Sequence, residues 1–278
     1  MHVFHFPKRR GTAFAMLCLI GGLLAVATFG DGTNRRNSLL PAQPKATENL
    51  TVNDPRPVAE AVWQLEKKYG WIVTYEDPIY INSNEIADVT LQVRRDLDQY
   101  KPGEAPKVFI PKGGELSISF YLNPDTGRPV EPPETVVQRL LDANSAVGYA
   151  GKFRLESNRR VMHIIPTGYK DISGAVISHP SILDSIITIP AQERTGLQSL
   201  ELLCDAVSLS ARMKMRLGTL DRNLFGSSRN RIGVNRVKAR VFLMKTLETV
   251  NLYAGHSWQL FYDPTMKNYA LNIHPVSK

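Results

Sequence analysis

The chain has 278 residues and a formal net charge of +8, from 34 Lys and Arg against 26 Asp and Glu. A hydrophobic fraction of 43% with 22% charged residues is ordinary for a globular protein, which argues against a wholly disordered, collagen-like or polytopic membrane protein. Two cysteines cannot build a disulfide-rich scaffold or a four-thiolate zinc site. At about 100 to 200 residues per domain, the length allows one large domain or two modest ones.

The first thirty residues have the pattern of an export signal. Residues 8–10 are Lys-Arg-Arg, and residues 11–30 follow without a charge. Ala25 and Ala27 place small side chains at alternate positions, as signal peptidase requires, so we expect a signal peptide, 1–27, cleaved after Ala27. The alternative is an uncleaved membrane anchor over 11–30. The protein is then periplasmic or secreted in the first case, and anchored in the inner membrane facing the periplasm in the second.

Cleavage after Ala27 changes the charge and the cysteine count. Three basic residues and no acidic ones are lost, which lowers the formal net charge from +8 to +5. Cys204 is then the only cysteine. It lies in a probable helix among leucines, and we expect it to be a buried small apolar side chain rather than a reactive thiol.

The folded part follows a polar stretch. Residues 28–49 are rich in Gly, Asn, Arg, Pro and Thr without apolar periodicity and are interpreted as a linker. A first module is expected over 50–168. It opens with a strand at 50–53 and a helix whose apolar residues recur every three or four positions until Gly70 ends it. Aromatic and β-branched residues at 71–75 then predict a strand.

A long irregular excursion over 76–115 interrupts the first module. So long a connection within a compact domain is usually functional or mobile, and its part 80–113 is a candidate partner-contacting surface. Tyr80 and Tyr100 are its candidate exposed aromatic contacts. The rest of the module is predicted as a strand, an apolar-striped helix and a hairpin, at 116–122, 132–141 and 153–165.

A second module is expected over 186–276, after a linker at 169–185. Its predicted elements are a strand, a helix and two further strands, then a helix and a closing hairpin, at 186–190, 197–207, 211–217, 236–241, 243–250 and 258–274. The order βαβ followed by βαββ therefore occurs twice, which indicates an internal repeat. The predicted fold class is α+β, with two small tandem βαβ-βαββ domains, each with two helices packed on short mixed sheets.

This order resembles the short secretin and TonB N-terminal (STN) module, which is similar to the N0 domain of secretins. Residues 65–75 and 247–262 each show the characteristic phrase of that module, a helix with leucines at helical spacing, a Gly and an aromatic strand. The resemblance covers most of the chain after the signal segment, and it implies a protein-binding module of the cell envelope without catalytic residues. The sequence departs from the family in the excursion at 76–115, which is longer than such a module needs, and in having no β-barrel or secretin domain after the modules.

No residue pattern in the sequence indicates a particular chemical reaction. None of the six histidines has a partner at the spacing of a zinc-protease helix, and neither a nucleophile elbow nor a phosphate-binding loop occurs. We therefore predict no catalytic, cofactor-binding or metal-binding residue and no cofactor. Glu76 and Asp77 at a strand end leave one alternative, a secreted hydrolase, because two carboxylates about 5 to 9 Å apart can hydrolyse a glycosidic bond. The Asp-Pro sequence also initiates turns, and a turn is the interpretation that we favour for these residues.

Basic residues gather in the second module. Arg212, Lys214 and Arg216 alternate with apolar residues, so we expect three cations on one exposed strand face. More basic residues follow in a stretch expected to be a loop. The candidate partner-binding cations are Arg212, Lys214, Arg216, Arg222, Arg229 and Arg231. They suit an acidic envelope protein or an anionic surface or polymer, whereas nucleic acid conflicts with export. A simply solvated strand face is the alternative.

The leading functional hypothesis is a non-enzymatic, exported envelope protein that binds a partner through strand edges, the basic residues or the excursion. The alternatives are the secreted hydrolase and a membrane-tethered structural subunit of an envelope complex. The sequence indicates neither the partner nor the oligomeric state.

Overall fold

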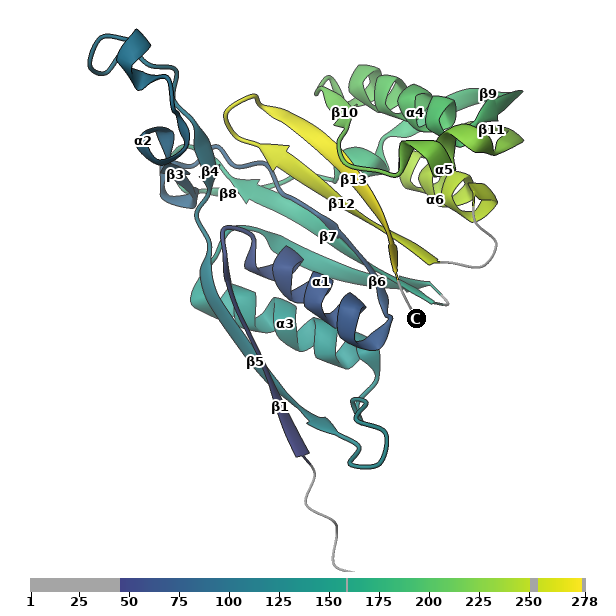
Figure 1. Cartoon of the computed structure of the whole chain (residues 1–278), viewed down its shortest axis with the longest axis horizontal. Helices are drawn as coiled ribbons and strands as arrows, with labels where there is room; N and C mark the ends of the chain where they lie inside the picture. The colour runs from purple at the N-terminus through teal and green to yellow at the C-terminus, as the bar shows by residue number, and fades with distance from the viewer. Residues whose placement is uncertain (1–45, 159, 251–254, 277–278) are drawn as a thin grey trace, which may run out of the picture. The chain divides into compact units, whose positions relative to one another are not determined.

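The computed structural model describes residues 46–158, 160–250 and 255–276, which all lie within one compact unit, Pro44–Lys278. The fold is α+β, as predicted, with a main mixed sheet of seven strands and three two-stranded sheets (Figure 1). No helix among these residues is both long and apolar enough to cross a membrane. The predicted signal peptide at 1–27 and most of the linker lie outside the described residues.

The main sheet combines strands from both ends of the chain. In spatial order its strands are β10 (Met215–Leu217), β13 (Asn268–Val276), β12 (Gly255–Asp263), β2 (Ile72–Glu76), β7 (Val161–Lys170) and β6 (Lys152–Asn158), with β8 (Val176–Ser178) beside β7. The strand β2 pairs in parallel with β7 on one side and with β12 on the other. Through the second pairing, strands that are far apart in sequence form one continuous sheet.

A first pair of helices lies between this sheet and a two-stranded ribbon. The ribbon consists of β1 (Ala46–Asp54) and β5 (Gly114–Leu122), which are antiparallel, and the helices are α1 (Pro57–Tyr69) and α3 (Pro133–Val147). Alternate residues of β5 are buried, which turns its apolar side towards the helices. Helix α1 begins at a proline and ends at Gly70, whose φ of 69° is the left-handed conformation expected there.

A second ribbon and helix pair come from the C-terminal part of the chain. The ribbon consists of β9 (Ile186–Thr195) and β11 (Arg229–Lys238), and the helix pair consists of α4 (Gly196–Ala211) and α6 (Ala239–Val250). The short helix α5 (Arg222–Ser227) lies between them in the chain. A capping box between Thr195 and Gln198 starts α4. Cys204 is 4% exposed within the core of this part, as expected.

The two helix pairs pack on opposite faces of the main sheet. Val73 and Tyr75 of β2 belong to the core beneath α1 and α3, whereas Glu76 reaches Arg240 of α6 on the other face. Figure 1 shows the same arrangement, with α1 and α3 on one side of the sheet and α4 to α6 on the other. Successive residues of a strand point to opposite faces, so β2 faces the helices of both parts of the chain.

The excursion predicted to be irregular contains short elements. In chain order they are the 3₁₀ helix η1 (Ser83–Glu85), β3 (Ile86–Asp88), α2 (Thr90–Val93), η2 (Leu97–Gln99) and β4 (Phe109–Pro111). The strands β3 and β4 pair antiparallel. The Phe109 amide donates to Thr265 Oγ1 at 2.7 Å, which ties the excursion to the β12–β13 turn. A third 3₁₀ helix, η3 (Ile182–Asp184), and β8 lie within the stretch predicted to be a linker.

Two strand boundaries differ from the prediction. The alternating residues from Ala211 onwards were expected to form one strand, but only Met215–Leu217 is extended, because α4 continues to Ala211 and Arg212 ends it with a φ of 53°. The strand expected at 236–241 ends at Lys238, and Ala239 begins α6. In both places the alternation of basic and apolar residues continues across a helix boundary, the end of α4 in the first and the start of α6 in the second, so the local pattern does not locate the boundary.

Candidate functional site

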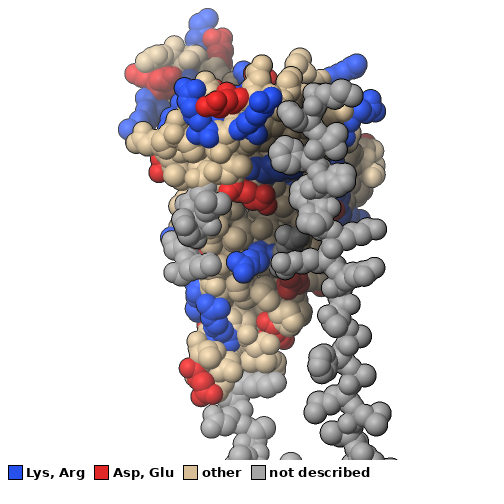
Figure 2. All heavy atoms as spheres, turned by 90° about the vertical axis from the view of Figure 1, so that its right-hand side faces the viewer, with Lys and Arg blue, Asp and Glu red and all other residues tan. Residues whose placement is uncertain are grey.

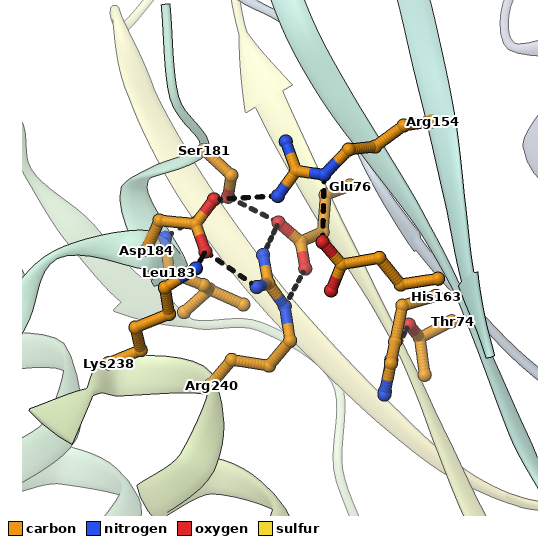
Figure 3. Close-up of polar contacts among 10 residues, drawn as sticks. Thr74, Glu76, Arg154, His163, Ser181, Leu183, Asp184, Lys238 and Arg240 are labelled. Carbon is orange, nitrogen blue, oxygen red and sulfur yellow. Dashed lines mark hydrogen bonds and ion pairs between the residues drawn. The ribbon is translucent and has the colours of Figure 1, made fainter. Parts of the chain in front are cut away.

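The most strongly charged buried cluster lies where β2 meets the C-terminal part of the chain (Figure 3). Glu76, the last residue of β2, is fully buried. Arg240 on α6 binds it with two parallel hydrogen bonds, Nε to Oε1 at 2.9 Å and Nη2 to Oε2 at 3.0 Å. The Ser181 hydroxyl donates to Glu76 Oε2 as well. This two-bonded geometry is the strong form of an arginine–carboxylate pair.

Asp184 in η3 is the second carboxylate of the cluster. It accepts from Arg240 Nη1 at 2.8 Å, and it pairs with Lys238 Nζ at 3.0 Å and Arg154 Nη2 at 3.2 Å. Burial alone would raise the pKa of Asp184, but the charge of Arg240 and hydrogen bonds from the surrounding cations lower that pKa to about 2. Asp184 is therefore ionised at neutral pH.

Asp77, the next residue after Glu76, is held by a separate network. Its carboxylate accepts from Arg56 Nε at 2.7 Å and from the hydroxyls of Tyr75 and Tyr80, both at 2.9 Å. It also accepts from the Tyr262 backbone amide at 2.9 Å. Burial, followed by the charge of Asp77, raises the pKa of both Tyr75 and Tyr80. Both hydroxyls therefore stay protonated and remain donors.

A buried histidine completes the polar contacts around β2. His163 Nδ1 lies 2.8 Å from Thr74 Oγ1, and its ring packs on Trp258 with centroids 5.2 Å apart. Burial and then the nearby Arg240 charge lower the pKa of His163 to about 4. His163 is therefore neutral at pH 7.

Chemically, the buried carboxylates of this cluster are paired with cations from other parts of the chain. Glu76 and Asp77 are 0% and 1% exposed, and each is neutralised by its own arginine. Because they are neighbours in an extended segment, their side chains diverge instead of facing one substrate. The paired carboxylates join β2 to α6 and β12, so their role in the described part of the chain is to hold the sheet together.

The main sheet has an edge strand at each end, although the Met215 amide of β10 already donates to the Ser208 hydroxyl oxygen of α4 at 2.9 Å. Within the described residues, β6 and β10 each pair on one side only, with β7 and β13. Lys152 and the last three residues of β6 are exposed. The unpaired side of an edge strand presents backbone donors and acceptors that an incoming strand can use.

The six candidate basic residues are all exposed but do not share one strand face. Arg212 ends α4, Lys214 precedes β10, Arg216 lies in β10 and Arg222 begins α5. Arg229 and Arg231 lie in β11 rather than in a loop. None of the six forms an ion pair with another described residue. Figure 2 shows lysines and arginines over the upper part of this side of the molecule, interspersed with acidic and neutral side chains rather than in one continuous area.

The two candidate aromatic contacts differ. Tyr80 was expected to be exposed but is only 4% exposed, because its hydroxyl is needed by the buried Asp77. Tyr100 is half-buried, stacks beneath Arg94 at 4.9 Å and accepts a hydrogen bond from Arg94 Nη2 at 3.0 Å. Tyr100 therefore remains available in part, and Tyr80 does not lie on the surface.

Most of the cluster was not predicted from the sequence. Glu76 and Asp77 were singled out as candidates, but Arg240 and Asp184 were not. A signal for Arg240 exists, because it is a cation in line with Leu243 and Leu247, on the buried stripe of an apolar helix. A charge at such a position needs a buried counter-charge.

Comparison with known protein families, with curated proteins and with solved structures finds no match to this chain.

Proposed function

We propose that this protein is a non-enzymatic, protein-binding component of the cell envelope, exported by its first 27 residues and built from two related STN-like modules at 50–168 and 186–276. The observation that carries the proposal is the junction of β2 with β12. There, β2, the edge strand of one three-stranded part of the sheet, pairs in parallel with β12, the edge strand of the other part. The same kind of edge is left open at β6.

The strand pairings support a relation between the two modules. In the first, β2 is parallel to β7, and β6 is antiparallel to β7. In the second, β10 is parallel to β13, and β12 is antiparallel to β13. Each module also has its own antiparallel ribbon and a pair of helices next to it. This layering is what the STN resemblance implies for each module.

An open strand edge gives a physical route to binding. An extended segment of a partner adds to the sheet through backbone hydrogen bonds, and the alternate side chains of the edge strand give selectivity. On β6, Arg154 and Glu156 form a partly exposed ion pair on one face, while Phe153 and Leu155 pack against the core on the other. This edge therefore offers both charge and apolar surface to an incoming strand.

The geometry gives no support to the hydrolase alternative. A glycosidase needs one carboxylic acid that can release a proton and a second carboxylate at reach of the same bond. Glu76 and Asp77 are instead buried and saturated with donors. Neither can contact a substrate without opening the sheet junction.

A photo-crosslinking amino acid placed in the native cell tests the proposal. At Ser157, an exposed position on β6, we expect ultraviolet light to give a covalent adduct with a protein that mass spectrometry identifies. Leu209 on α4 is the control position, because it is also exposed but lies on a helix. Equal adducts at both positions, or none at Ser157, would contradict the proposal.

A further inference from the structure

The two open ends of the main sheet are complementary to each other. β10 occupies in the second module the place that β2 occupies in the first, since each is parallel to the central strand of its module. β6 likewise occupies the place of β12. Within one chain, the β12 edge of the second module is paired with the β2 edge of the first. The free pair, β6 and β10, is therefore the same pair of edges.

We propose that the partner of the β6 edge is a second copy of this chain, which pairs in parallel through its β10 edge and so continues the sheet from molecule to molecule. This inference rests on the proposed function, of which it names the partner. It repeats between chains the strand pairing that already joins the two modules within one chain.

The register of the junction can be transferred residue by residue. Leu260 of β12 lies opposite Leu271 of β13, and Leu155 of β6 lies opposite Ile164 of β7. Since Gln259 pairs with Tyr75 and Leu260 with Glu76, the equivalent contacts between copies join Arg154 to Leu217, and Leu155 to Gly218. Gly218 has no side chain to obstruct the approach of a neighbouring strand.

Two charged residues support this register, because they would form a pair like that of Arg240 and Glu76 with the two signs exchanged. Arg240 is the second residue of α6, and it reaches across β12 to Glu76. The second residue of α3 is Glu134, which is bound at β6 by the Ser157 hydroxyl at 2.9 Å and makes no ion pair among the described residues. In the neighbouring copy it would meet the face of β10 that carries the exposed Arg216.

Arg216 is suited to this role. It lies two residues before the position equivalent to Glu76 and therefore on the same face of its strand. Its only described polar contact is a long one, from Nε to Asn268 Oδ1 at 3.5 Å. Both Glu134 and Arg216 are thus charged groups at the open ends of the sheet without a charged partner inside the described chain.

The predicted assembly is open. The interface joins two different edges, so it is heterologous and leaves one free edge at each end. The helix pairs of the two modules lie on opposite faces of the sheet. Successive modules along the continued sheet would therefore place their helices alternately on one face and on the other. Pairing of this kind extends a row of molecules and does not close a two-fold dimer.

Sedimentation velocity of the purified chain at increasing concentration, with charge-reversal variants, tests the inference. We expect a series of dimers, trimers and larger species. Glu134→Lys and Arg216→Glu should each weaken association about tenfold, and the double variant should recover most of it. Glu201→Lys and Lys245→Glu make the same charge changes at exposed helical positions and should leave association unchanged. Circular dichroism of each variant verifies that it is folded.

Three results would overturn the inference: a monomer at every concentration up to about 100 μM, a range that covers weak strand-edge interfaces; a dimer that grows no further; or single reversals that act no differently from their controls. If the chain is monomeric while Ser157 crosslinks a different protein, the inference fails and the proposed function stands. If Ser157 crosslinks nothing, both fail.

Discussion

Glu76 and Arg240 lie 164 positions apart in the sequence and form a buried, two-bonded ion pair across the junction of β2 with the C-terminal part of the chain. A buried pair contributes little net stability compared with apolar residues of the same volume, but the loss of one partner leaves an uncompensated charge. The pair therefore fixes which surfaces meet at the junction more than it stabilises them.

Breaking this pair from one side should be costly. We expect Arg240→Met to lower the free energy of unfolding by about 3 to 5 kcal/mol, because Glu76 is left buried without its cation. The double variant Glu76→Met with Arg240→Met should recover a large part of that loss. Urea unfolding followed by tryptophan fluorescence, to which the buried Trp258 contributes, measures both.

A matched control for the ion pair exists on the surface. Lys68 and Glu48 form an ion pair at 2.7 Å with both side chains partly exposed. Lys68→Met should cost less than about 1 kcal/mol. A cost for Arg240→Met as small as this one would show that the junction does not depend on the buried pair.

The two tyrosines of the excursion should respond differently to removal of the hydroxyl. Tyr80→Phe deletes a hydrogen bond to the buried Asp77 carboxylate, and we expect a loss of about 1.5 to 3 kcal/mol in the free energy of unfolding. Tyr100→Phe removes only a contact with Arg94 at the surface of the excursion and should cost less than about 1 kcal/mol. Chemical denaturation of the two variants side by side compares them, and equal losses would contradict the assigned burial.

His163 should make stability depend on pH. Its pKa is about 4 in the folded chain against an ordinary value of 6.5, so the unfolded chain binds a proton more readily. The contribution of neutral His163 is complete above pH 6.5 and is lost as the pH falls towards 4, with a slope of at most about 1.4 kcal/mol per pH unit. Unfolding titrations from pH 7 to 4 measure this slope.

His163→Gln is the control for that slope, because glutamine does not titrate in this range. The variant should be less stable at pH 7 but should lose less stability on acidification than the original chain. An identical pH dependence in the two proteins would show that other groups are responsible.

Cys204 should be inert in the folded protein. Burial raises the pKa of its thiol to about 12, with smaller contributions from Asp205 and Glu201. In a Cys18→Ser background, a thiol-specific reagent at pH 8 should therefore label Cys204 only as fast as the chain unfolds. Rapid labelling in the absence of denaturant would show that α4 is more accessible than its packing indicates.

Much of the secondary structure follows from local sequence. The helix ending at Gly70 and the strand after it are both visible in the 3.6-residue period, the left-handed glycine and the aromatic run. The hairpin of β12 and β13 was predicted for the same reason. These elements are determined by interactions among near neighbours, which a single sequence displays.

The junction was not predictable in this way. The pairing of β2 with β12 and the contact of Glu76 with Arg240 depend on tertiary packing, which leaves no periodic pattern. The burial of Tyr80 was unpredictable for the same reason, because it depends on a tertiary contact, the hydrogen bond from its hydroxyl to Asp77. The basic residues from Arg212 were assigned to one strand because alternation of polar and apolar residues also occurs where a helix ends.

Hydrogen–deuterium exchange tests the central claim, that the β6 edge accepts a strand, most directly. Exchange is measured on the chain with and without the protein that crosslinks to Ser157, or at low and high concentration if that protein is a second copy. We expect slower exchange in residues 152–158 on binding, and no change in residues 46–54 and 114–122 of the β1–β5 ribbon. Protection confined to other segments, with β6 exchanging as fast as in the free chain, would contradict the account.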